Sequence, residues 1–175
     1  MSLCDKKVEL QKYFPLNNKS TENKSIKCES IYISNLPLYY KDFPSLHESK
    51  SYLYGWLCGY FATDGSCDKN GSCRISSANL DNIKFIRDVC SVIGIGYGSI
   101  LEETRKSSFE NDDKIYKLYT ISLMKSTINE NFFIRSDQKI NFNNSNGEET
   151  EKKYWVVESV QETEREEEVY CAIVE

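Results

Sequence analysis

The stretch that decides the fold is Tyr52-Leu53-Tyr54-Gly55-Trp56-Leu57-Cys58-Gly59-Tyr60-Phe61-Ala62-Thr63-Asp64-Gly65. It is an apolar run without proline, and this pattern predicts a helix up to Thr63. Gly55 and Gly59 lie four residues apart, and Ala62 and Thr63 continue the same face of small residues. Because small residues at this spacing let two backbones approach closely, we expect tight packing along this face.

Asp64 goes against the local preferences of this helix. It falls at the C-terminal end, where the helix dipole disfavours a carboxylate, and the Gly65 that follows suits a left-handed cap. If two such helices pack side by side, their aspartates converge and repel each other unless a cation lies between them. A hard divalent ion such as Mg²⁺ fits such a pair and commonly serves phosphodiester cleavage. The same residues also fit an ordinary amphipathic helix that ends in a solvated aspartate.

The second half of the stretch resembles the signature of the LAGLIDADG homing endonucleases. Leu57, Gly59, Asp64 and Gly65 hold the matching letters of that signature, whereas Ala62 departs from it where its first acidic residue falls. The resemblance implies a DNA endonuclease that uses Mg²⁺ at the paired ends of two such helices. It makes Asp64 the metal-binding carboxylate, with Gly65 beside it. The residues expected at the helix-pair interface are Gly55, Cys58, Gly59 and Ala62.

The composition indicates a globular intracellular protein. The chain has 175 residues, of which 39% are hydrophobic and 13% aromatic, so it can bury a core within one domain that carries appendages. Its seven cysteines form no C-x-x-C pair, and no signal peptide or long apolar run is present, so we expect reduced thiols in the cytoplasm and no membrane partner. Cys67 and Cys73 are poorly spaced for zinc. Because His47 is the sole histidine, histidine-based catalysis is not expected.

The net charge of −5 is concentrated at one end of the chain. Residues 1–45 carry seven lysines against five acidic residues, and residues 46–142 carry equal numbers of basic and acidic residues. Residues 143–175 carry three basic residues against ten acidic ones. The acidity therefore belongs to the tail, and the middle of the chain is free to form a basic face.

Three regions follow from these patterns. We interpret residues 1–45 as an N-terminal arm that is partly loop, with Asn17–Ser25 loop-like, a short strand at Ser30–Ser34 and an apolar arm at Leu36–Tyr40. Residues 46–142 form the main domain, and residues 143–175 form an acidic linker with C-terminal strands.

The main domain alternates helices with hairpins. Asn70-Gly71 is a strong hairpin signal, and Gly94 to Gly98 indicate a helix stop and turn, because a dinucleotide fingerprint would open a helix instead. The expected helices are 48–63, 80–93 and 127–133, and the expected strands are 65–68, 72–77, 99–106 and 115–124.

The resemblance extends over this order of elements, and Ser77 to Gly98 in particular match a strand, helix and Ile-Gly-x-Gly turn of the family. It implies an α+β fold of order α-ββ-α-ββ-α, in which a four-stranded antiparallel saddle sheet carries helices on one face. The saddle would lie in the major groove of double-stranded DNA, where polar strand residues contact bases and phosphates. These side chains could also form the solvated face of an ordinary sheet. The residues at matching places are Lys69, Asn70, Arg74, Ser76, Arg105, Lys106, Lys117 and Thr120.

The family also places a lysine near the scissile phosphate. Lys139 is the best match here, and Lys125 is the alternative. Because one motif occurs where the chemistry needs two helices, the resemblance implies a homodimer formed through the Gly55 and Gly59 face, with a near-palindromic target.

The tail carries a second resemblance. Residues 154–160 and 169–175 alternate like two strands and resemble the C-terminal splicing strands of an intein, although the terminal His-Asn is not reached. The chain is therefore interpreted as an intein endonuclease insert that does not splice by itself, whose host is a DNA replication protein such as a primase or helicase. Two alternatives stay open: a decayed relative that binds DNA without cutting it, and a structural intein segment with neither activity.

Overall fold

The computed structural model describes residues 2–14, 20–24, 29–33, 36, 42–106, 115–144, 159, 160 and 162. The strands expected at 154–160 and 169–175 lie outside these residues, apart from Ser159 and Val160. No helix among the described residues is long and apolar enough to cross a membrane.

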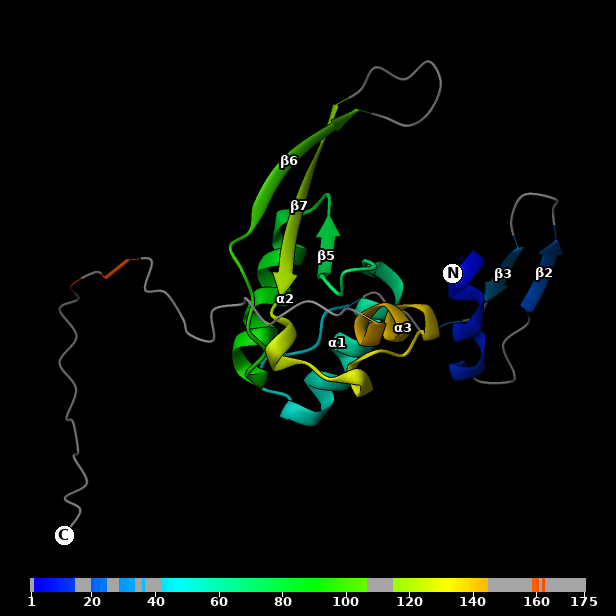
Figure 1. Ribbon diagram of the computed structural model, residues 1–175, viewed down its shortest axis with the longest axis horizontal. Helices are drawn as coiled ribbons and strands as arrows, with labels where there is room; N and C mark the ends of the chain where they lie inside the picture. The colour runs from blue at the N-terminus through cyan, green and yellow to red at the C-terminus, as the bar shows by residue number, and fades with distance from the viewer. Residues whose placement is uncertain are drawn as a thin grey trace, which may run out of the picture.

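The main body is an α+β unit built on one antiparallel sheet, as the sequence predicts. The strand order β4-β5-β7-β6 places the second hairpin beside the first one, joined through β5 and β7 (Figure 1). Its elements in chain order are α1 (Lys50–Asp64), β4 (Gly65–Cys67), β5 (Cys73–Ser77), α2 (Leu80–Ile93), β6 (Leu101–Lys106), β7 (Ile115–Leu123), η3 (Lys125–Thr127), η4 (Glu130–Phe132) and α3 (Ser136–Asn144).

Helix α1 begins and ends for different local reasons. The Ser49 hydroxyl accepts a hydrogen bond from the Tyr52 amide at 3.2 Å and caps the N-terminus. At the other end Gly65 has φ −83° and ψ 158°, so the expected left-handed cap is wrong. Glycine is required there because a Cβ would lie 2.5 Å from the ring of Phe61. The chain thus passes directly from α1 into β4 across the Phe61 ring.

Helix α2 has the boundaries that the sequence predicts. The Asn79 side chain accepts a hydrogen bond from the Asp81 amide at 2.9 Å at its start. Gly94 ends it with φ 84°, the left-handed conformation that favours glycine.

The third helix lies later in the chain than the sequence predicts. Residues 127–133 form no α-helix but two short 3₁₀ turns, η3 and η4, and the helix is α3. The Thr127 hydroxyl explains the difference: it donates to the Met124 carbonyl at 2.8 Å and accepts from the Gly96 amide at 3.0 Å. A tertiary bond to the glycine turn therefore replaces helical bonding at this point.

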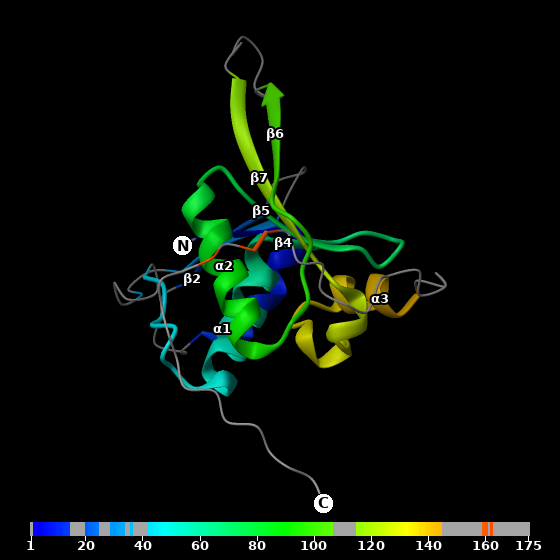
Figure 2. The same cartoon turned by 90° about the vertical axis from the view of Figure 1, so that its left-hand side faces the viewer.

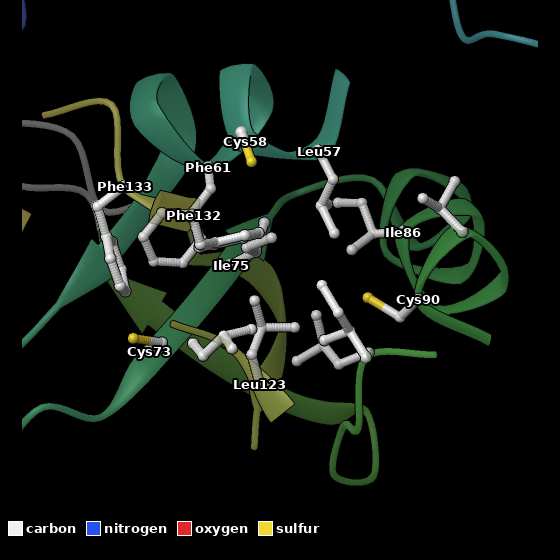
Figure 3. Packing of buried hydrophobic residues seen from close by; sticks show 14 of the residues in the cluster. Leu57, Cys58, Phe61, Cys73, Ile75, Ile86, Cys90, Leu123, Phe132 and Phe133 are labelled. Atoms are coloured by element: carbon white, nitrogen blue, oxygen red, sulfur yellow. The ribbon is translucent and has the colours of Figure 1, made fainter. Parts of the chain in front are cut away.

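The core lies between the helices and one face of the sheet. Strands β4 and β5 alternate buried and exposed residues, with Cys67, Cys73 and Ile75 turned inward and Ser66 and Arg74 outward. Figure 3 shows Cys73 and Ile75 in the cluster with side chains of α1, α2 and the η4 region. The fully buried members include Leu53, Leu57, Phe61, Ile75, Ile83, Ile86, Val89, Cys90, Ile121 and Phe132.

The N-terminal residues form a separate small sheet. Its order is β1-β3-β2, formed by Ser2–Cys4, Glu29–Ile33 and Ser20–Lys24, with the 3₁₀ helix η1 (Asp5–Tyr13) packed on it. The expected strand is therefore present at Glu29–Ile33. The expectation of a loop throughout Asn17–Ser25 is wrong at Ser20–Lys24, because backbone pairing with β3 accommodates this polar edge strand.

The N-terminal sheet docks on the main body through a second hydrophobic cluster. Leu3, Leu10, Ile31 and Ile33 are buried with Ala62 of α1. Leu36 packs on this cluster, while the rest of the arm expected at Leu36–Tyr40 lies outside the described residues. In Figure 1 this unit lies beyond α3, on the side away from α2. The N-terminal sheet thus covers the C-terminal turn of α1 at Ala62.

Candidate active site and nucleic-acid interface

Asp64 is the last residue of α1, and its side chain is exposed where the helix meets the sheet. Within the described chain it makes no hydrogen bond or ion pair. The pKa of nearby Tyr60 is raised chiefly by burial and further by the negative charge of Asp64, while a hydrogen bond with Asn82 opposes both. The carboxylate is therefore open to solvent and to a ligand that approaches the end of the helix.

Side chains from α3 and the residue before it hold this end of α1. Arg135 is 8% exposed; its Nη1 donates to the Ala62 carbonyl at 3.3 Å, and its Nε and Nη2 donate to Asp137 at 3.0 and 2.8 Å. Gln138 Nε2 donates to the carbonyls of Phe61 and Gly65 at 3.2 and 2.9 Å. The Phe61 carbonyl also accepts from the Gly65 amide, so Gln138 adds a second donor there and supplies a donor to the Gly65 carbonyl. The Arg135 guanidinium serves the Ala62 carbonyl and complements the helix dipole.

This support was not predicted from the sequence. The local signal that could have placed α3 is Ser136-Asp137, because Ser and Asp after an apolar run are typical of a helix start. The partners of Gln138 are more than 70 residues away in sequence, so the contact depends on the tertiary structure.

Gly65 is less suited to metal binding than the resemblance implies. Its carbonyl accepts a hydrogen bond from the buried Gln138, so it faces the interior of the chain. No cluster of three or more His, Cys, Asp or Glu side chains suited to a metal ion exists among the described residues. Asp64 is therefore the exposed candidate ligand among the predicted metal-site residues, and a metal site there would need a second carboxylate or water ligands.

One strip of α1, formed by Tyr52, Gly55 and Gly59 and called the glycine strip below, faces open space. A Cβ added at Gly55 or Gly59 would meet no atom within 4 Å, and Tyr52 on the same strip is 55% exposed. Cys58 and Ala62 do not share this strip: Cys58 is buried in the main core, and Ala62 is buried under the N-terminal sheet. Of the four residues expected at a helix-pair interface, Gly55 and Gly59 are accessible to a partner.

The two candidate lysines both have partners nearby. Lys139 forms an ion pair with Glu130 at 3.2 Å, and hydrogen bonds from Lys139 and Asn143 lower the pKa of that carboxyl. The ammonium of Lys125 lies 5.1 Å from the centroid of the Phe142 ring. Contact of either lysine with a phosphate would exchange these interactions for new ones.

The candidate DNA-contacting residues divide between two faces and a turn. By strand register Arg74, Ser76, Thr120 and Arg105 share the face opposite the helices. Thr120 is 7% exposed, and its hydroxyl bonds with that of Ser76 at 2.8 Å, so this pair is largely shielded.

The remaining candidates lie on the other face of the second hairpin or at the tip of the first. Lys106 and Lys117 are on the helix side of the sheet, but β6 and β7 extend beyond the helices, so both lysines are exposed (Figure 2). Lys69 and Asn70 are exposed in the turn between β4 and β5. The basic residues are therefore spread along the sheet, because the turn with Lys69 lies beyond the Cys73–Leu123 pair and Lys106 lies at the Ile115 end of the second hairpin.

Most of these basic residues have acidic partners. Arg74 pairs with Asp68 at 3.1 Å, Arg105 with Glu103 at 3.4 Å and Lys117 with Glu102 at 2.7 Å. The bond to Glu102 raises the pKa of Lys117. Lys69 and Lys106 have no ion pair within the described parts of the chain. The sheet thus presents a charge-balanced surface and not a strongly basic one.

Comparisons of the chain with protein-family models, with curated proteins and with solved structures found no match.

Proposed function

We propose that the protein is a homing endonuclease of the LAGLIDADG type, which binds double-stranded DNA as a homodimer and hydrolyses it with Mg²⁺. The observation that carries this proposal is the position of Asp64. Its exposed carboxylate lies at the end of the helix whose glycine strip is open, at the point where the chain enters the sheet. The order α-ββ-α-ββ-α of the main body supports the proposal further.

The metal site would form between two copies. Asp64 from each copy would supply carboxylate oxygens, and Mg²⁺ commonly binds through one or two carboxylates and keeps several waters. When bound, the ion supplies positive charge that stabilises the phosphodiester transition state. Lys139 or Lys125 would place a second positive charge near the scissile phosphate. Gln138 and Arg135 would act indirectly, because they fix the end of α1 that carries Asp64.

The projecting sheet would supply the DNA contacts. A two-stranded ribbon fits the major groove, and Arg74 and Arg105 lie on the face of the sheet that the helices leave open. Lys69 and Asn70 at the first turn would reach the DNA backbone, as would Lys106 and Lys117 on the second hairpin. Ser76 and Thr120 would contribute mainly by stiffening the strands through their mutual hydrogen bond.

The glycine strip would form the dimer interface. Gly55 and Gly59 allow a second copy of α1 to approach closely, and a twofold axis beside them would bring the two Asp64 side chains together. The proposed origin as an intein insert in a replication protein rests on the sequence pattern of the tail.

Selection from a randomised duplex library, followed by cleavage, tests this function. Duplexes retained by the chain at low salt are amplified, then incubated with the protein and Mg²⁺ or with EDTA. We expect defined strand breaks with Mg²⁺ and none with EDTA. Asp64→Asn should retain binding and lose cleavage by at least about 100-fold, while Asp81→Asn, an exposed acid in α2, should cleave normally.

The other outcomes identify the alternatives. Salt-sensitive binding without cleavage in any divalent ion would indicate a decayed DNA-binding relative. Absence of any retained duplex would contradict the proposal as a whole and favour a structural role.

A further inference from the structure

Cys67 and Cys73 face each other across the first hairpin. They are register partners on β4 and β5, and their sulfur atoms lie 3.4 Å apart, with the Cys73 thiol donating to Cys67. The Asp68 amide donates to the Ser72 carbonyl one step nearer the turn, so the two cysteines form a non-hydrogen-bonded pair. In such pairs the Cα atoms lie about 4.5 Å apart, within the range that a disulfide spans.

The surroundings distinguish Cys67 from the isolated buried cysteines. Burial raises the pKa of the Cys58 thiol to about 11 and that of the Cys90 thiol to about 12, so both stay protonated and inert at neutral pH. The pKa of Cys67 is instead lowered, chiefly by the hydrogen bond from Cys73. Lys125 lowers it further, while burial, Asp68 and Asp137 oppose the shift.

The solvent exposure of Cys67 and the pKa of Cys73 also favour a reaction between these two cysteines. Cys67 is 8% exposed, whereas Cys73 is 1% exposed, so a small oxidant reaches Cys67 first. Donation to Cys67 and burial raise the pKa of Cys73, which therefore keeps its proton until the first sulfur has been oxidised. The arrangement resembles a reactive thiol with a resolving thiol beside it.

We propose that Cys67 and Cys73 form a reversible disulfide in response to peroxide. The Cys67 thiolate attacks one oxygen of hydrogen peroxide, breaks the O–O bond and becomes a sulfenic acid, and the hydroxide released takes up a proton to become water. The Cys73 sulfur, losing its proton, attacks the Cys67 sulfur and displaces the second oxygen as water. Overall two thiols lose two electrons and two protons, and one peroxide becomes two waters.

The disulfide would fix the turn at the tip of the first hairpin. Residues 68–72 lie between the two cysteines, and Asn141 of α3 donates to the Cys67 carbonyl at 2.8 Å on the other side. Oxidation would therefore cross-link β5 to β4, which Asn141 of α3 already holds at Cys67. This inference does not depend on the nuclease proposal, because the reaction involves the chain alone.

Peptide mass mapping of the full chain tests the inference. The folded protein is treated with stoichiometric hydrogen peroxide, remaining thiols are alkylated, and the digest is searched for linked peptides before and after a dithiol reductant. We expect the Cys67–Cys73 link to form before any other and to disappear after reduction. Cys67→Ser and Cys73→Ser should each abolish it, and Cys58→Ser, also at a buried position, should leave it intact.

Peptide mapping of the unsubstituted chain tests the Cys67–Cys73 disulfide even if a serine variant misfolds. Two unmodified thiols at these positions while Cys58 or Cys90 reacts would overturn the proposal. A first disulfide that joins either residue to a different cysteine would also overturn it.

Discussion

At the residue scale, two glycines of the central helix region serve opposite purposes. Gly65 is needed because a Cβ would lie 2.5 Å from the Phe61 ring, whereas a Cβ at Gly59 would meet nothing within 4 Å in the chain. Gly59 therefore carries the usual conformational cost of glycine in a helix without a packing benefit inside one copy. The proposed second copy of the chain would give Gly59 a packing role.

Exchange of each glycine for alanine separates these roles. Gly65→Ala should lower the free energy of unfolding by about 1–3 kcal/mol, because Phe61 must shift. Gly59→Ala should raise it by about 0.5–1 kcal/mol when the protein is dilute and monomeric. Urea denaturation measures both. A stabilising effect of Gly65→Ala would contradict the packing described around Phe61.

Gln138 is the other residue whose role can be measured alone. Its amide nitrogen serves the carbonyls of Phe61 and Gly65, while its Oε1 is buried without a hydrogen-bond partner in the described chain. Gln138→Leu should cost about 1–3 kcal/mol of unfolding free energy, because the buried Gly65 carbonyl loses this donor and the Phe61 carbonyl keeps only the Gly65 amide. The matched control is Asn143→Ala on the exposed side of α3, with an expected change below about 0.5 kcal/mol. Equal effects of the two variants would show that Gln138 does not hold the end of α1.

At the element scale, the N-terminal 3₁₀ helix η1 contributes to the candidate site through α3. Glu9 accepts hydrogen bonds from the backbone amide of Ser136 at 2.7 Å and from its hydroxyl at 2.6 Å. A carboxylate at a helix N-terminus satisfies free amides and complements the dipole. Lys6 also pairs with Asp137 at 3.5 Å. Residues far apart in sequence thus cap the helix that supports Asp64.

Removal of this cap should loosen α3. Glu9→Ala is expected to lower the unfolding free energy by about 1 kcal/mol and to speed amide hydrogen exchange in α3. Glu48→Ala, a change at an exposed residue outside the cap, serves as the control. Unchanged exchange in α3 of the Glu9 variant would show that the two units are independent.

The elements also show what the sequence could predict. Helices α1 and α2 and the first hairpin carry strong local signals: a proline-free apolar run, a glycine at the end of α2, and an Asn-Gly turn. The third helix was misplaced because Thr127 bonds to the Gly96 amide, a long-range contact that no local pattern reveals. The edge strand β2 was missed for a similar reason, since its polar residues depend on pairing with β3.

The candidate site divides in the same way. Asp64 and the glycine strip follow from one short motif; Asp64 is exposed and a Cβ at Gly55 or Gly59 would meet no atom within 4 Å, while the roles assigned to these residues stay predictions. The supporting contacts of Arg135 and Gln138, and the burial of Ala62, arise from packing of distant segments. Helical periodicity alone could not separate Ala62 from the open strip, because it does not report what covers a helix face.

At the scale of the whole molecule, charge balance would limit the affinity of the proposed DNA binding. The chain has a net charge of −5, and Arg105 on the open face is paired with Glu103. Phosphate contacts would have to compete with this acid as well as with counterions. We therefore expect binding that is weak at physiological salt unless the sequence of the DNA contributes.

Neutralisation of this acid should strengthen DNA binding. Glu103→Gln frees Arg105, so affinity for a duplex should rise about threefold at low salt and the gain should shrink as salt is added. Fluorescence anisotropy with a labelled duplex measures this change, with Asp81→Asn on α2 as the control. An unchanged affinity in the Glu103 variant would remove Arg105 from the proposed interface.

The central claim is that two copies of Asp64 act together, and subunit mixing tests it most directly. Wild-type chain is mixed with an equal amount of Asp64→Asn, allowed to exchange subunits, and assayed at constant total protein for Mg²⁺-dependent scission of either strand of a selected duplex, nicks and double-strand breaks counted together. If both aspartates are required, about one quarter of the dimers stay active, and cleavage should fall to about a quarter of that of the unmixed protein. A fall to about half would mean that each copy acts alone and would contradict the paired site.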